Sequence, residues 1–266
     1  MFASRTASIC LVSMVSLTMC QQALAGPFFV LVGWRGEFAR IDATTTEVYE
    51  SPQTVPLRLQ ALAFSPGGIL YAGPGEERDL FTVDPVDGTT NHLLSIDSDI
   101  RGMAFSPEGD LYVVAREEQT TPTILRIISL TDGSHTDVGT LGGVGMQAQG
   151  LAFSPDGQLY TVRPDGDNYD LYMVNPDNAE AHFIGSHTGG LYQGLAFTPE
   201  GSLYAVGYSA FAQLNPGNGA IIGDTIELSG DYRGLAFIPE PTTLVLLSLS
   251  GLALLRRRRL PSNRSM

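Results

Sequence analysis

The sequence predicts an all-β fold built from repeated units, and three observations support this class. A phrase made of a small residue, Leu or Met, Ala and Phe occurs five times, ending at Phe64, Phe105, Phe153, Phe197 and Phe237. The first four copies each lead through a Pro-containing turn into a Leu-Tyr pair. Successive copies are 41, 48, 44 and 40 residues apart, which is the length of a unit of four short strands. This spacing predicts a β-propeller.

Each unit is predicted to contain four strands, counted from the centre of the propeller outward. The innermost strand is the recurring phrase. The second strands are residues 70–71, 111–113, 159–161 and 203–205, and the third are residues 80–83, 124–127, 171–174 and 211–214. The fourth strands are less regular, as in residues 92–96 and 181–184. Turns such as Pro107-Glu108-Gly109 join the first strand to the second, because Pro fixes φ and Gly accepts a positive φ.

The fifth copy, residues 234–238, supplies an innermost strand only. The N-terminal region holds three strands without a partner, at residues 29–33, 38–42 and 46–50. Pairing the two sets gives five blades in a ring closed by one C-terminal and three N-terminal strands, which leaves no free sheet edge. An open array and a six-bladed ring are the alternatives, and both leave these termini unpaired.

Residues 1–25 have the features of a secretory signal peptide, with Arg5 before an apolar run and an Ala-Leu-Ala cleavage site at residues 23–25. A lipoprotein acylated at Cys20 is the alternative, although Met19 is large for such a site. Both cysteines, Cys10 and Cys20, lie in this segment, so the exported chain has no thiol and no disulfide. The propeller is expected to span residues 26–238.

The chain is acidic, with a formal net charge of −13 and no Lys. Residues 26–238 contain nine Arg against 27 acidic residues, a net charge of −18, because the other Arg residues lie near the chain ends. Such a surface repels phosphate backbones, so nucleic acid is not expected as a partner.

The C-terminus carries three features in order: Pro239-Glu240-Pro241, an apolar run over residues 242–255, and the cluster Arg256, Arg257, Arg258 and Arg259. This segment resembles the PEP-CTERM sorting signal of exported Gram-negative proteins. The resemblance implies that the Pro-Glu-Pro element is recognised by an exosortase, a membrane transpeptidase-like protease. The seven residues 260–266 after the Arg cluster depart from the family, whose members usually end there.

Membrane physics supports the same placement of this segment. Fourteen residues of helix at about 1.5 Å each span roughly 21 Å, less than the ~30 Å hydrocarbon core, so the anchor is short. The Arg cluster holds its far end in the cytoplasm, with residues 260–266 as a cytoplasmic tail. The protein is therefore expected outside the inner membrane, tethered by its C-terminus and then released to the cell surface or beyond. A permanent membrane tail is the alternative.

A candidate ligand site lies just before each copy of the phrase. These positions hold Gln60, Arg101, Gln149, Gln193 and Arg233. Five equivalent positions at the start of the innermost strands would form a polar ring at one mouth of the channel, where amide and guanidinium groups suit sugar hydroxyls or carboxylates. The alternative is that these side chains only solvate the channel. If the turns after the phrase lie at the opposite end, the ring faces away from the membrane.

A calcium site is a second candidate, at the acidic loop that contains Asp165, Asp167 and Asp170. Carboxylate oxygens are the ligands that Ca²⁺ prefers, but the loop lacks an EF-hand pattern, and an ordinary acidic loop is the alternative. No other cofactor is expected. His92, His135 and His182 fall on different outer strands at unequal offsets, so they do not predict a shared metal site.

These features predict a binding or matrix module at the cell surface, not an enzyme, with an exosortase as processing partner and a polysaccharide or surface protein as ligand. The repeats also resemble those of gluconolactonase-like propellers, but the motif is structural and implies no activity. A surface glycan hydrolase is the competing function. It would need two or three carboxylates within about 5 to 10 Å of one another at the channel mouth.

Overall fold

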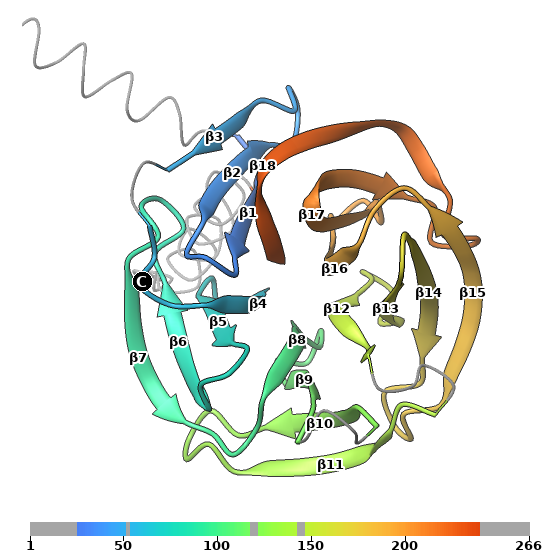
Figure 1. Ribbon diagram of the computed structural model, residues 1–266. Helices are drawn as coiled ribbons and strands as arrows, with labels where there is room; N and C mark the ends of the chain where they lie inside the picture. Colours follow the sequence, from blue (N-terminus) through green and yellow to red (C-terminus); the bar gives the residue numbers. More distant parts are fainter. Residues whose placement is uncertain (1–25, 52–53, 118–121, 143–146, 240–266) are drawn as a thin grey trace, which may run out of the picture.

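The strands are arranged around a central axis, as Figure 1 shows. The computed structural model describes residues 26–51, 54–117, 122–142 and 147–239. These residues form eighteen strands and no α-helix. The all-β propeller class predicted from the repeats is therefore confirmed.

Three sheets have four strands each, and their strands follow one another in the chain. The first contains β4 (Leu59–Phe64), β5 (Leu70–Pro74), β6 (Asp79–Val83) and β7 (Thr90–Ser95). The second contains β8 (Ile100–Phe105), β9 (Leu111–Ala115), β10 (Ile124–Ile128) and β11 (His135–Thr140). The third contains β12 (Gln149–Phe153), β13 (Leu159–Asp165), β14 (Asn168–Val174) and β15 (Ala181–Thr188). In each sheet the recurring phrase forms the inner edge strand, as predicted.

The fourth sheet has six strands in the order β16-β17-β18-β1-β2-β3. Its members are β16 (Tyr192–Phe197), β17 (Leu203–Leu214), β18 (Ile221–Ile238), β1 (Phe28–Gly33), β2 (Phe38–Asp42) and β3 (Val48–Glu50). The prediction of five separate blades is wrong in this respect, because the described residues form four sheets. The predicted outer strand of the fourth unit and the fifth inner strand are one continuous strand, β18, and β17 likewise merges two predicted strands.

Strand β18 keeps the fourth and fifth units in one sheet because its two halves pair with different partners. Its first half pairs with β17 from Ile221↔Leu214 to Glu227↔Ala210, and after an irregularity that skips Leu228, Ser229 and Gly230 the pairing resumes at Tyr208↔Asp231. Its second half pairs with β1, with Phe28↔Ile238 and Leu31↔Leu235 in register. Strands β1, β2 and β3 then pair in turn. The C-terminal strand therefore joins the three N-terminal strands, as predicted.

Neighbouring units are held together by aromatic pairs that the repeat explains. In the first three units the Tyr of the Leu-Tyr pair packs against the Phe of the next phrase, whereas Tyr204 of the fourth packs against Phe29 and Phe211. Ring centroids are 5.1 Å apart for Tyr71 and Phe105, 5.3 Å for Tyr112 and Phe153, and 5.2 Å for Tyr160 and Phe197. Such tilted and edge-on pairs are favourable beyond the area they bury. The repeat thus encodes the contact between units as well as the strands within each.

The predicted signal peptide and apolar C-terminal helix lie outside the described residues. Within the described part of the chain, no helix has the length and apolar character needed to cross a bilayer.

Candidate functional site

The five predicted ligand-site positions lie where the inner strands begin, and a β-bulge interrupts each strand there. The pairing of β4 with β5 skips Gln60, that of β8 with β9 skips Arg101, and that of β16 with β17 skips Gln193. The pairing of β1 with β18 skips Arg233. In β12 the skipped residue is Gly150, directly after Gln149. A bulge changes the direction of a side chain at the end of a strand ladder, so the backbone conformation helps to orient the side chains at these positions.

Three of the five side chains form one hydrogen-bonded chain that links three sheets. The Nη1 of Arg101 donates to Oε1 of Gln60 at 3.1 Å, and Nε2 of Gln60 donates to Oε1 of Gln149 at 2.7 Å. Gln60 is 1% exposed and Arg101 9% exposed. A buried network of this kind fixes its members in single orientations. We call the five positions Gln60, Arg101, Gln149, Gln193 and Arg233 the polar mouth.

Two carboxylates, which lie outside the predicted ligand set, pair with the arginines of the polar mouth. Asp99 Oδ2 accepts from Arg101 Nη2 at 2.6 Å, and Asp231 accepts from Arg233 Nη2 at 2.7 Å and from its Nε at 3.1 Å. In both pairs the Asp comes two residues before the Arg, where an inner strand begins. That repeated spacing was visible in the sequence and is the signal by which these pairs could have been found.

The Asp99 carboxylate lies in the more unusual electrostatic environment of the two. Burial raises its pKa above the ordinary value, although Arg101, Arg116 and Arg78 act in the opposite direction. Burial and the neighbouring charge of Arg101 lower the pKa of Arg116. Within the described residues, Asp99 Oδ1 and Arg101 Nε are buried without a hydrogen-bond partner. Neither atom is in contact with solvent in this conformation.

Trp34 joins the second ion pair to a surface cavity. The Arg233 guanidinium lies 4.3 Å from the indole ring centroid and the Arg58 guanidinium 5.4 Å from it, both as cation–π contacts. The backbone N–H of Trp34 donates to the carbonyl of Asp231 at 3.0 Å, which fixes the loop between β1 and β2 on the mouth. Gly75 leaves room for the Trp34 ring beside Gln60, because a side chain at position 75 would collide with both residues.

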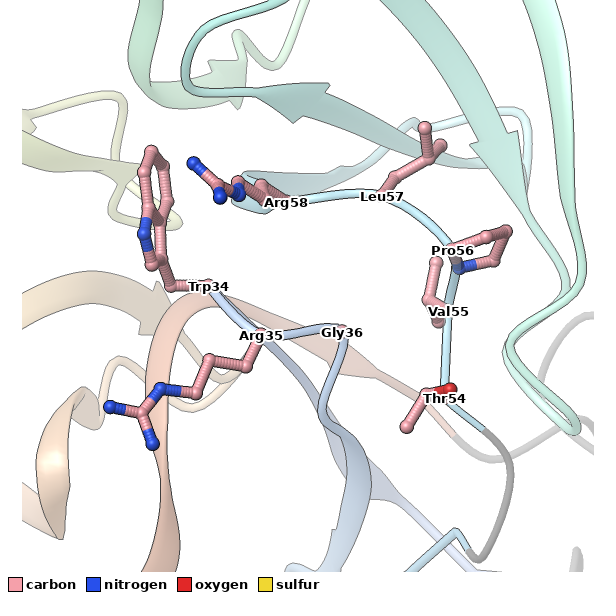
Figure 2. A pocket seen from close by; sticks show the side chains of 8 residues that line it. All are labelled: Trp34, Arg35, Gly36, Thr54, Val55, Pro56, Leu57 and Arg58. Atoms are coloured by element: carbon pink, nitrogen blue, oxygen red, sulfur yellow. The ribbon is translucent and has the colours of Figure 1, made fainter.

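The cavity has a volume of about 610 Å³ and is formed by two segments, residues 34–36 and 54–58. Figure 2 shows the side chains of Trp34 and Arg58 close to each other on one side of it, with that of Arg35 directed away. Arg58 also pairs with Glu76 at 3.0 Å, in the loop between β5 and β6. An aromatic ring, a guanidinium and the apolar side chains of Val55, Pro56 and Leu57 therefore line a concave surface next to the polar mouth.

The structure does not bring every predicted site residue into a cluster. No side-chain hydrogen bond within the described residues links Gln193 to the rest of the polar mouth. In the acidic loop, Asp165 faces Asn168 across the end of the β13–β14 hairpin, and the buried Asp170 pairs with Arg163. The described residues hold no group of three or more His, Cys, Asp or Glu suited to a metal ion. Asp165 and Asp170 both lie against the Arg163 guanidinium, which neutralises part of the negative charge of this loop.

Comparison with known proteins gives one sequence match and a set of fold matches. Residues 237–259 match the PEP-CTERM protein-sorting motif. Comparison with curated protein sequences found no match. Among solved structures, a chain of a nidogen/laminin complex has a TM-score of 0.56 at 13% identity, covering 80% of this chain and 98% of that one. A gluconolactonase from Xanthomonas campestris has a TM-score of 0.52 at 13% identity, covering 82% and 85%.

The motif match confirms the sorting signal predicted from Pro239, Glu240, Pro241 and the Arg cluster. It implies export, anchoring through the C-terminus and an exosortase as processing partner. Of these residues the structure describes Pro239; the others lie outside the described part. At 13% identity the solved structures show the propeller fold and nothing further.

Proposed function

We propose that this protein is an exported surface module that binds a polysaccharide at the polar mouth. The observation that carries the proposal is the buried chain Arg101–Gln60–Gln149, which links three sheets and leaves Arg101 Nε without a partner within the described residues. Such preorganised donors suit the hydroxyl and carboxylate groups of sugars. Trp34 and the adjacent cavity supply the apolar surface against which a sugar ring packs.

The test is binding of the mature chain, residues 26–266, to neutral and to uronic-acid-containing polysaccharides by calorimetry, with and without Ca²⁺. The informative variant is Arg233→Gln, because Arg233 is partly exposed and contacts Trp34. We expect at least a tenfold loss of affinity, which corresponds to about 1.4 kcal/mol. The matched control is His182→Gln, on the exposed outer strand β15. Undiminished affinity in both Arg233→Gln and Gln193→Ala would exclude the polar mouth as the site.

A glycan or lactone hydrolase is the second candidate, and one observation favours it. Asp99 lies in the polar mouth with a pKa raised by burial, which is the property of a general acid. A protein of similar fold is a gluconolactonase. Turnover of a glycoside or aldonolactone that falls at least a hundredfold in Asp99→Asn would support the enzyme. Binding without turnover in the parent protein would support the binding module.

A further inference from the structure

The other end of the channel is an apolar pocket to which all five units contribute. Its walls are the last residues of the inner strands and the turns that follow, and its volume is about 510 Å³. We call it the phenylalanine pocket after the side chains that all five copies of the phrase place in it, namely Phe64, Phe105, Phe153, Phe197 and Phe237. All five are partly exposed. A smaller cavity of about 110 Å³ shares these five Phe residues and is otherwise lined by the inner strands.

The hydroxyl groups in the pocket wall are already used by the turns. Ser106 Oγ accepts from the N–H of Asp110 at 3.2 Å, and Ser154 Oγ accepts from the N–H of Gln158 at 3.0 Å. Ser65 Oγ accepts from the N–H of Ile69 at 3.0 Å. The Phe and Pro rings form most of the rest of the lining, so most of the surface offered to an occupant is apolar.

The chain itself leads an apolar segment to this pocket. Pro239, the last described residue, is one of the lining residues. The run of residues 242–255, rich in Leu, begins three positions later. A segment tethered at the rim meets the pocket at a high effective concentration, so even weak apolar contacts favour docking.

Charge around the pocket fits the end of the same segment. The turns at its rim carry the exposed acidic residues Glu108, Asp110, Asp156 and Glu200. The apolar run ends in four consecutive arginines, Arg256–Arg259. An apolar plug followed by a basic cluster is complementary to an apolar pocket with an acidic rim.

We propose that the phenylalanine pocket holds the chain's own C-terminal segment, residues 242–259. The leucine side chains fill the pocket and the arginines lie against the acidic turns. Docking shields the sorting segment from water while it is outside a bilayer, and the bilayer and the pocket compete for it. This site is independent of the polar mouth, so it stands or fails separately from the proposed polysaccharide binding.

The experiment measures how accessible the segment is in the mature chain, residues 26–266. Both native cysteines lie before residue 26, so Ser248→Cys introduces a single thiol into the apolar run. Its labelling rate with a water-soluble maleimide is measured at nanomolar protein without detergent, and compared with the rate in guanidinium chloride. We expect labelling at least tenfold slower in the folded protein. The double reversal Glu108→Lys/Glu200→Lys and the pocket variant Phe153→Ser should each restore at least half of the lost rate.

The matched control is Glu77→Lys/Asp167→Lys, which reverses two exposed charges in loops away from the pocket and should leave labelling slow. The charge variants change only exposed turn residues, so they test the proposal even if Phe153→Ser unfolds. Fast labelling in the parent protein overturns it. Slow labelling that depends on protein concentration assigns the contact to a second copy and overturns it. Slow labelling unaffected by the charge reversal and by a folded Phe153→Ser places the segment elsewhere and overturns it as well.

Discussion

The two ends of the central channel are made by the same five inner strands, but their chemistry differs. At the end of each strand the phrase repeats, so five equivalent Phe side chains build one apolar pocket. At its start the five positions hold three Gln and two Arg, and their contacts differ: Arg101, Gln60 and Gln149 form a hydrogen-bonded chain, whereas Arg233 contacts Asp231 and Trp34. The repeated residues build the scaffold, and the residues that depart from the repeat make the polar mouth asymmetric.

The largest expected effect is at the polar mouth, where Arg101→Met removes the charge that faces Asp99. The Asp99 side chain is 20% exposed, so its carboxylate would remain largely buried without its ion pair. We expect a loss of about 3 kcal/mol in the free energy of unfolding, measured in urea. The double variant Arg101→Met/Asp99→Asn removes the stranded charge and should recover most of this loss. A single variant within about 0.5 kcal/mol of the parent would show that the pair is dispensable.

A somewhat smaller effect is expected between the two ends, at Gly102. A Cβ there would lie 2.8 Å from backbone atoms of Gly150 in the neighbouring inner strand, so Gly102→Ala has to push two inner strands apart. We expect a loss of about 2 kcal/mol, because overpacking against backbone cannot be relieved by a rotamer change. Gly67→Ala is the control, since its Cβ would meet only Ser65 Oγ at 3.8 Å. Equal stability of the two variants would contradict the close strand packing.

Substitution of one partly exposed residue in the phenylalanine pocket and one in the polar mouth compares the two ends of the channel directly. Phe153 is half-buried and packs 5.3 Å from Tyr112, whereas Gln193 takes no part in the bonded chain at the other end. Truncation of a fully buried Phe costs 3–5 kcal/mol, so we expect Phe153→Ser to cost about 2 kcal/mol and Gln193→Ala less than about 0.5 kcal/mol. Thermal unfolding of both variants at one pH measures the difference. A larger loss in Gln193→Ala would mean that the mouth, not the pocket, stabilises the ring.

The repeat made much of this fold predictable, because strand alternation and turn chemistry are local. The inner strands, the Leu-Tyr strands and the pairing of residues 234–238 with the N-terminal strands all follow from the pattern. The number of sheets does not, because β18 resumes its pairing with β17 at Asp231 after an irregularity that skips Leu228, Ser229 and Gly230, and local sequence propensity does not predict that resumption.

The sequence identifies the five positions of the polar mouth, but it does not predict the hydrogen bonds between their side chains. Position before each phrase identifies Gln60 and Arg101, whereas the bulges that redirect them depend on the register between neighbouring strands. The contact of Trp34 with Arg233 joins residues about 200 positions apart and depends on ring closure. In the acidic loop the carboxylate spacing predicts a metal site, and the contact of Arg163 with Asp170 could not be predicted because it depends on the register between β13 and β14.

The smallest effect is a pH dependence that separates Asp99 from the other carboxyl groups. Because its pKa is raised in the folded state, the folded protein keeps this proton at pH values where the unfolded chain, with a pKa of 3.8, has released it. Asp99 therefore lowers stability as the pH rises from that value through the folded pKa. Asp42 and Asp79 have lowered pKa values and act in the opposite direction, so only a difference between variants isolates Asp99. The free energy of unfolding of Asp99→Asn relative to the parent, measured from pH 3 to pH 7, should increase with pH. A difference that is flat or decreases would mean that Arg101 outweighs burial and that this carboxylate is an ordinary ion-pair partner, which would remove the acid that the hydrolase needs.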